Sequence, residues 1–310
     1  MNLELRTMRP TEKILTSLNL PARDAYDLPT SRKRFPDDGQ YRVEIPSCEG
    51  PRAMEAVIAA ARDHNVSIHR VSQGSGVMLQ TDDEIGRMLD LGREHGIEVC
   101  LFVGPRANWD VGVQAASASG KVLGSSLRGA DQLAYGLDDV RHAASLGIRS
   151  VLVADVGQLF VLGRMKAAGD LPADFVLKIS VTLAAANPAT ARVLEDLGAT
   201  SINLPVDLSL PQIAAIRQAI DAAIDFYVEA PDDFGGTVRH YEIAELVRVA
   251  APIYLKFGLR NAPGIYPSGQ HIEATVLALS RERVRRAAIG LALLRRYSSD
   301  AVPSPVAVRV

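Results

Sequence analysis

Charged side chains stand at or near the ends of several predicted strands, where they could perform chemistry. The strongest candidates for catalysis are Glu44, Asp155, Lys178, Glu229 and Lys256. The stretch "VLVADVG" shows the pattern, because an apolar run ends on Asp155 and a glycine turn. A buried parallel strand is normally a nearly continuous apolar run, and ligands bind at the carboxyl ends of such strands. We therefore expect these five side chains to meet at one mouth of the fold.

Lys178 is the sharpest of these candidates, because it stands among apolar residues in "VLKIS". Apolar surroundings favour the neutral amine, which can attack a carbonyl group. The alternative is an ion pair between Lys178 and Asp155 or Glu229. Those two carboxylates would serve as general acid and base, or would hold a divalent metal ion together with Glu44. The alternative for both carboxylates is that they neutralise the positive charges of the lysines.

A second group of polar residues is expected to bind the substrate. These candidates are Arg70, Arg106, Asn203, Arg260, Ser268, Gln270 and His271. The last three belong to "RNAPGIYPSGQH", a glycine-rich loop that leads into a helix. Such loops bind phosphate through backbone N–H groups, so the loop predicts a cradle for an anionic group of the substrate; an ordinary turn is the alternative.

Other notable residues are assigned mainly structural roles. Cys48 follows the first strand without a visible base, which favours a small buried thiol. His69 stands alone and indicates a structural histidine. The long insertion that contains Trp109, Arg128 and Asp131 could form a lid over the site.

Strands alternate with helices along most of the chain, which predicts a parallel sheet. The strands are expected at 41–46, 67–72, 98–105, 150–157, 175–182, 201–207, 225–231 and 253–259. Eight such units favour a closed (β/α)8 barrel of the TIM type over an open sheet; "KVLGSS" is an alternative ninth strand. We expect an irregular N-terminal arm at 1–40, the barrel at 41–296 and a C-terminal tail at 297–310.

Composition excludes several classes of protein. The formal net charge is −2, and no basic stripe suggests a nucleic-acid partner. No apolar stretch approaches the length needed to cross a membrane, and the N-terminus lacks the apolar region of a secretory signal. Two cysteines in 310 residues predict a reduced, cytoplasmic protein. The arm is expected to lie on its own barrel or on a second copy of the chain.

Three segments resemble the collagenase-like peptidase family of unassigned mechanism, peptidase family thirty-two. They are "SVLVADVGQLFVL", "NPATARVLEDLGATSINLPVDLSLPQIAAIRQAI" and "DFYVEAP". The resemblance implies a barrel-like catalytic domain, which is a peptidase in some members and carries an iron–sulfur cluster in others. Here Glu229 and Ala230 replace the family's histidine and glycine, and the acid of that motif falls at Asp225. The cysteines that would follow are absent from "PDDFGGTVRHYE", so we expect no iron–sulfur cluster.

These observations predict an enzyme, lyase-like or aldolase-like in its chemistry, that acts on a small anionic carbonyl compound. It would act at the carboxyl ends of the strands, through a lysine or through a metal held by carboxylates. A peptidase-like hydrolase and a non-catalytic ligand-binding barrel remain the alternatives.

Overall fold

The computed structural model describes residues 9–105 and 124–306. Eight parallel strands form a closed barrel in which each strand pairs with the next and β8 pairs with β1. The strands are β1 (Tyr41–Pro46), β2 (Arg70–Gln73), β3 (Glu98–Phe102), β4 (Ser150–Val153), β5 (Val176–Ile179), β6 (Ser201–Asn203), β7 (Ala223–Glu229) and β8 (Ile253–Phe257). The predicted TIM barrel is confirmed. "KVLGSS" lies mostly outside the described residues.

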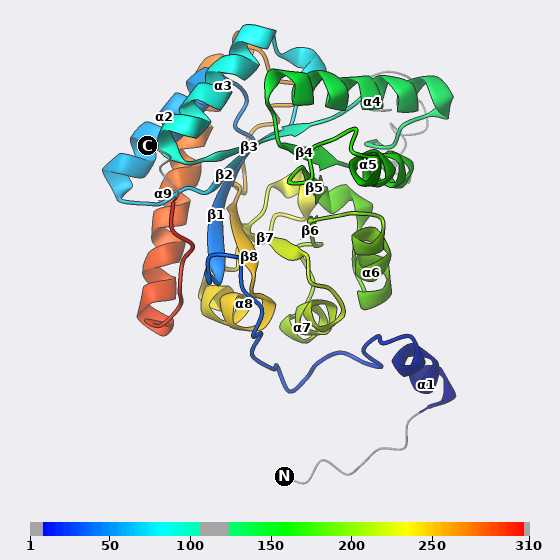
Figure 1. Cartoon of the computed structure of the whole chain (residues 1–310). Helices are drawn as coiled ribbons and strands as arrows, with labels where there is room; N and C mark the ends of the chain where they lie inside the picture. Colours follow the sequence, from blue (N-terminus) through cyan, green and yellow to red (C-terminus); the bar gives the residue numbers. More distant parts are fainter. Residues whose placement is uncertain (1–8, 106–123, 307–310) are drawn as a thin grey trace.

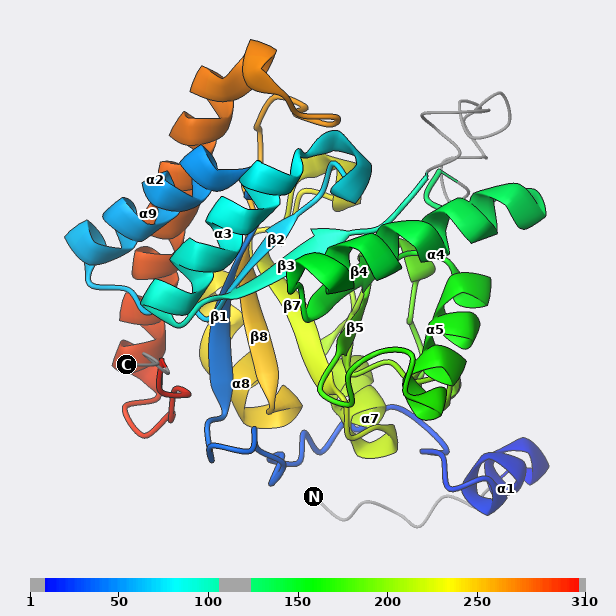
Figure 2. The same cartoon turned by 45° about the horizontal axis from the view of Figure 1, so that its top comes forward.

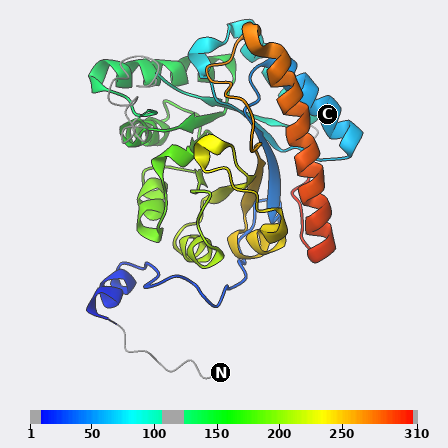
Figure 3. The same ribbon diagram turned by 180° about the vertical axis from the view of Figure 1, so that it is seen from behind.

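Helices surround the barrel and cover its apolar outer face (Figure 1). They are α2 (Pro51–His64), α3 (Asp82–His95), α4 (Gly129–Leu146), α5 (Val156–Ala168), α6 (Pro188–Asp196), α7 (Leu210–Ala219), α8 (Ile243–Ala250) and α9 (Glu273–Tyr297). The helix α1 (Pro10–Ser17) belongs to the N-terminal arm and lies apart from the barrel in Figure 1. The last helix packs beside α2 along the height of the barrel (Figure 3). None of the helices in the described ranges has the length and apolar character to cross a bilayer.

Local sequence signals determine where these helices begin and end. The hydroxyl of Thr81 accepts a hydrogen bond from the backbone N–H of Glu84, whose side chain reaches back to Thr81. This reciprocal capping satisfies two backbone donors at the start of α3. Gly96 ends the helix with a positive φ of 65°, a conformation that glycine adopts without a steric penalty.

The N-terminal arm and the C-terminal tail close the amino ends of the strands (Figure 2). The ring of Phe35 in the arm meets Tyr254 of β8 edge to face, at 5.2 Å between centroids. The backbone carbonyl of Val302 in the tail accepts hydrogen bonds from the N–H groups of Gln40 and Tyr41. The described contacts of the arm therefore place it on its own barrel, and ligands can approach the barrel interior from the carboxyl ends of the strands.

His69 fastens the tail to β1. Its Nδ1 accepts a hydrogen bond from the N–H of Val43 at 3.0 Å, while Nε2 donates to the carbonyl of Ser304 at 2.8 Å. This arrangement requires a neutral ring, and the predicted structural role of His69 is confirmed. Burial lowers the pKa of His69 below its usual value of 6.5, an effect that the nearby charge of Arg42 reinforces.

We expect the free energy of unfolding to fall as the pH drops below about 6.5. The unfolded chain then binds a proton at His69 before the folded chain does. Urea unfolding at a series of pH values measures the slope. The dependence of the unfolding free energy on pH should be much weaker in the variant His69→Gln, whereas the exposed control His64→Gln should show the parental dependence. An unchanged slope in His69→Gln would contradict the assignment.

Candidate functional site

The barrel interior holds a network of charged side chains. TIM barrels commonly fill this space with layers of apolar branched residues. Here the strand register places Glu44 of β1 beside Arg70 of β2 on one side and Lys256 of β8 on the other. Side chains alternate along a strand, so the three point into the interior together with Lys178 of β5 and Asp225 of β7. All five are at most 2% exposed.

Glu44 stands at the centre of this interior network. Its Oε1 accepts a hydrogen bond from Lys178 Nζ and lies 3.4 Å from Lys256 Nζ. Its Oε2 lies 3.4 Å from Arg70 Nη1, and the hydroxyl of Ser72 donates to Oε1 at 2.7 Å. Burial alone would raise the pKa of Glu44, but the positive charges of Lys178, Lys256 and Arg70 outweigh it and hold that pKa far below its usual value.

Asp225 is the second interior carboxylate. It accepts a hydrogen bond from the hydroxyl of Ser201 at 2.6 Å and lies 3.3 Å from Arg70 Nη1 and 3.6 Å from Lys178 Nζ. Sequence analysis noted Asp225 only as the acid of the family motif. The signal that could have found it is the start of β7 at Ala223, which makes Asp225 an interior position of the strand.

Lys178 is therefore paired, as one of its two interpretations held, but with Glu44 and Asp225. The prediction that Asp155 or Glu229 is the partner of Lys178 is wrong. Lys178 is fully buried, and its ammonium also donates to the hydroxyl of Ser72 at 2.9 Å. Its ammonium thus makes two hydrogen bonds and one longer ion pair, and it is sealed from the carboxyl ends of the strands.

Asp155 does not join the interior network, and the prediction that it would is wrong. Its side chain caps α5 by accepting a hydrogen bond from the N–H of Gln158 at 2.9 Å, and it accepts another from the N–H of Leu127 at 3.1 Å. β4 ends at Val153, two residues earlier. A carboxylate after a strand can be the N-cap of the next helix, and that is its role here.

Glu229 also points away from the interior, contrary to the prediction. A register shift between Tyr227 and Glu229 places Glu229 beside Phe257 of β8. Such a bulge reverses the side of the sheet that the side chain faces. Glu229 Oε2 lies 3.2 Å from both His240 Nε2 and Arg286 Nη1, on the helical layer. Those groups, together with the backbone N–H of Arg260, hold the pKa of Glu229 below its usual value although burial opposes them.

The three candidate metal ligands are consequently separated. Glu44 lies in the interior, Asp155 caps α5, and Glu229 faces α9. Among the residues that the structure describes, no group of three His, Cys, Asp or Glu side chains could hold a metal ion.

A cavity lies above the network at the carboxyl ends of the strands, and we call it the mouth pocket. Its volume is about 90 Å³. It is lined by Pro46, Ser47, Ser72, Gln73, Gly74, Phe102, Ser125, Leu152, Ser180, Val181, Thr182, Asn203, Tyr227, Phe234, Lys256 and Tyr266. Lys256 is the charged residue in this described lining, and it forms part of the floor that separates the pocket from Glu44.

Two side chains beside Lys256 are arranged for binding. The side-chain amide of Asn203 is placed in the orientation in which both its oxygen and its nitrogen form hydrogen bonds. In that orientation its oxygen accepts a hydrogen bond from Lys256 Nζ at 2.7 Å. The same ammonium lies 4.2 Å from the centre of the Tyr227 ring. Tyr227 is only 5% exposed, and its hydroxyl has no hydrogen-bond partner in the described parts of the chain. Burial, and the charge of Glu44, raise the pKa of Tyr227, so it remains a protonated donor.

The predicted substrate ligands are dispersed by the fold. Arg70 belongs to the interior network, and Asn203 lines the mouth pocket. Arg260 is exposed and lies 3.5 Å from Asp232. His271 is also exposed, and Arg106 lies outside the described residues.

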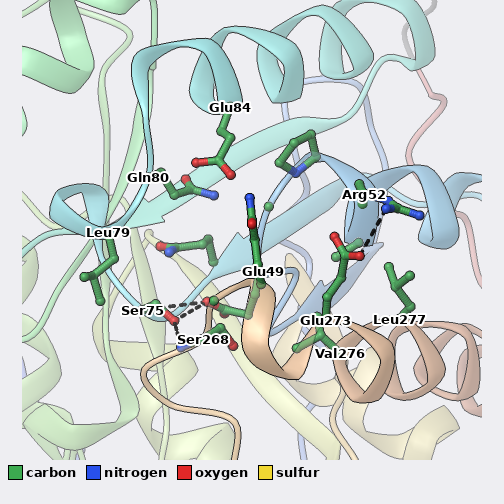
Figure 4. Close-up of a pocket in the computed structure, with 16 residues that line it drawn as sticks. Glu49, Arg52, Ser75, Leu79, Gln80, Glu84, Ser268, Glu273, Val276 and Leu277 are labelled. Carbon is green, nitrogen blue, oxygen red and sulfur yellow. Dashed lines mark hydrogen bonds and ion pairs between the residues drawn. The ribbon is translucent and has the colours of Figure 1, made fainter.

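Ser268 and Gln270 line a different cavity of about 240 Å³, the side pocket, between α2, α3 and α9 (Figure 4). The side pocket holds the carboxylates of Glu49, Glu84 and Glu273, and its guanidinium, Arg52, is paired with Glu273 at 3.1 Å.

Both hydrogen-bond donors of Ser268 are already used in the side pocket. The N–H of Ser268 donates to the hydroxyl of Ser75 at 2.8 Å, and that hydroxyl donates to Glu49. The hydroxyl of Ser268 donates to the carbonyl of Ile265 at 2.6 Å. The cluster of acids around these bonds opposes an anion, so the described contacts do not support the predicted cradle.

The remaining candidates have plain structural surroundings. Cys48 is buried, as expected, and burial, together with the charge of nearby Glu49, raises the pKa of its thiol. Arg128 and Asp131 stand at the start of α4, and Trp109 of the expected lid lies outside the described residues.

The fold and the mouth pocket define a TIM barrel with an ion-paired interior and a small polar site at its carboxyl end. The model of Peptidase family U32 matches residues 123–230. This match confirms the resemblance that the sequence motifs indicate. The matched segment contributes Lys178, Asn203, Asp225 and Tyr227 to the interior and to the mouth pocket.

Solved structures with a similar fold include the U32 peptidase Mk0906, at 19% identity over 76% of this chain and 98% of that one, with a TM-score of 0.43. The putative copper homeostasis protein CutC from Streptococcus agalactiae has 14% identity over 69% of this chain and 98% of its own, with a TM-score of 0.44. Dihydrodipicolinate synthase from Bacillus clausii has 12% identity over 84% and 76%, with a TM-score of 0.44. A comparison with curated proteins gives no match.

Proposed function

We propose that the protein is a TIM-barrel enzyme that acts on a small carbonyl compound bound in the mouth pocket. The observation that carries this proposal is the ammonium of Lys256, which stands at the floor of the pocket over the ring of Tyr227. Active sites of TIM barrels lie at this end of the strands. The pocket would hold the substrate with its carbonyl oxygen toward Lys256.

In this proposal Lys256 acts as a charged hydrogen-bond donor. Glu44 lies 3.4 Å from its Nζ and forms an ion pair with it. An ammonium fixed in a buried site stabilises negative charge that develops on a carbonyl oxygen during addition or elimination. Tyr227 would donate a hydrogen bond to a second oxygen atom of the substrate. Such chemistry is lyase-like or aldolase-like, and it assigns Lys178 a positioning role through Glu44.

The second candidate is a peptidase-like hydrolase, which the match to Peptidase family U32 favours. Hydroxyl pairs in the mouth pocket could supply a nucleophile, since Thr182 donates to the hydroxyl of Ser180 at 2.9 Å. The described lining, however, offers no histidine or carboxylate to act as the base that activates a serine. A non-catalytic barrel is the third candidate, supported by the mutual pairing of the interior charges.

Two further proposals concern the cellular location of the protein and its association with a second copy of the chain. The free thiols Cys48 and Cys100 are buried and unpaired with each other, which supports a reduced, cytoplasmic location. Ile14 and Leu18 on α1 are 59% and 62% exposed, which supports contact between the arm and a second copy of the chain.

The decisive variant for the proposed function is Lys256→Met. A panel of small aldehydes, ketones and short peptides is incubated with the protein and followed by NMR. Turnover of a carbonyl compound should fall by about 100-fold or more in this variant. The exposed control Lys13→Met should retain the parental rate. Turnover of peptides alone, or an undiminished rate in Lys256→Met, would refute the proposal.

A further inference from the structure

The charges beneath the mouth pocket cancel. The barrel interior contains three cations, Arg70, Lys178 and Lys256, and they are paired with three carboxylates. Two of those carboxylates are Glu44 and Asp225, and the third is Glu98, 2.8 Å from Arg70 Nε. A ligand entering from the carboxyl ends of the strands therefore approaches a neutral floor in the described structure.

Lys256, the group that a ligand would meet first, shares the carboxylate of Glu44 with Lys178 and Arg70. Its ammonium already faces Glu44 at 3.4 Å and Asn203 at 2.7 Å. An anion placed against this ammonium would also feel the repulsion of Glu44, in a buried region where charges are weakly screened. Burying an anion without an uncompensated cation is costly. The electrostatics of the pocket consequently disfavour a carboxylate or phosphate group.

The rest of the polar lining suits uncharged oxygen atoms. The hydroxyl of Ser180 accepts a hydrogen bond from Thr182 and keeps its own proton for another acceptor. The hydroxyl of Tyr227, on a side chain 5% exposed, has no partner among the described residues. Because Tyr227 lines the mouth pocket, its hydroxyl can donate a hydrogen bond to an uncharged oxygen atom of a ligand.

The mouth pocket is small, with a volume of about 90 Å³. It therefore favours a compound with a few non-hydrogen atoms.

We propose that the mouth pocket selects an uncharged, short-chain hydroxyaldehyde or hydroxyketone over the corresponding carboxylate. This inference deepens the proposed function and rests on it for the carbonyl group. It replaces the anionic substrate expected from the sequence with a neutral one. The carbonyl oxygen would lie at Lys256, and the hydroxyl group would bind Tyr227 or Ser180.

Hydroxyacetone and pyruvate provide a matched pair of probes, because they share a methyl ketone and differ in a hydroxymethyl group against a carboxylate. Titrations followed by ligand-observed NMR measure both dissociation constants on the full chain. Hydroxyacetone should bind more tightly by about tenfold or more. Tyr227→Phe should raise the dissociation constant of hydroxyacetone by about fivefold. The control Tyr241→Phe, at an 80% exposed position, should leave that constant unchanged.

A second variant tests the electrostatic cause. Glu44→Gln removes the compensating carboxylate and should shift the preference toward pyruvate. If that variant does not fold, the Tyr227→Phe comparison still decides the matter.

Equal or tighter binding of pyruvate by the parent protein would overturn the inference, as would saturable binding of neither probe. Tighter pyruvate binding that depends on Lys256 would leave the proposed function intact. Hydroxyacetone binding with unchanged turnover in Lys256→Met would sustain the inference and defeat the proposed function.

Discussion

Replacing Lys178 with methionine is expected to lower the free energy of unfolding by about 3–5 kcal/mol. The side chain is fully buried, and its ammonium lies against Glu44 and Asp225. Methionine fills a similar volume but leaves two carboxylates in the interior with reduced compensation. The loss comes from those unpaired charges, because the lysine itself gains little net stability from being buried.

Urea unfolding of Lys178→Met and of the exposed control Lys13→Met measures this effect. The control should unfold like the parent protein. The double variant Lys178→Met/Glu44→Gln removes one cation and one carboxylate together, and it should recover part of the loss. If Lys178→Met unfolds at the parental urea concentration, Lys178 does not hold the network together.

The variant Asp225→Asn is expected to cost a comparable amount, about 3 kcal/mol or more. The amide can keep the hydrogen bond from Ser201, but the interior then holds an excess positive charge near Arg70 and Lys178. Because Asp225 is completely buried, solvent cannot screen that excess. The structure thus predicts a large effect from a substitution that changes almost no volume.

The matched control is Asp221→Asn, only four residues away. Asp221 pairs with Lys33 at 2.6 Å, but its side chain is 85% exposed. Exposed ion pairs contribute about 1 kcal/mol or less, so this variant should unfold nearly like the parent. Equal effects of the two substitutions would contradict the assignment of Asp225 to the sealed interior.

The sequence predicts the barrel well, because the alternation of apolar strands and amphipathic helices is repeated eight times and leaves few alternatives. It also predicts that Glu44, Lys178 and Lys256 converge. Each stands within a regular strand, so the alternation of side chains determines which way it points. Where the strands are regular, position in the sequence is enough to place the side chain.

Asp155 and Glu229 show where this reasoning stops. A carboxylate after a strand looks the same in sequence whether it binds a ligand or caps a helix, and Asp155 is a cap. A bulge near Glu229 reverses the direction of its side chain, and it arises from pairing with β8, which the local sequence does not encode. Tyr227 was missed for a related reason, because a tyrosine within an apolar strand resembles ordinary core.

The neutral interior also constrains how this chain can change over generations. A single substitution at any of its five buried charged positions leaves an uncompensated charge in a space that water does not reach. Acceptable changes must therefore occur in compensating pairs, each removing one positive and one negative group, or must be preceded by stabilising changes elsewhere. The mouth pocket has no such restriction on its hydroxyl-bearing walls. The residues that line the mouth pocket can therefore change one at a time and alter ligand preference, while the charged residues of the interior are kept or replaced together.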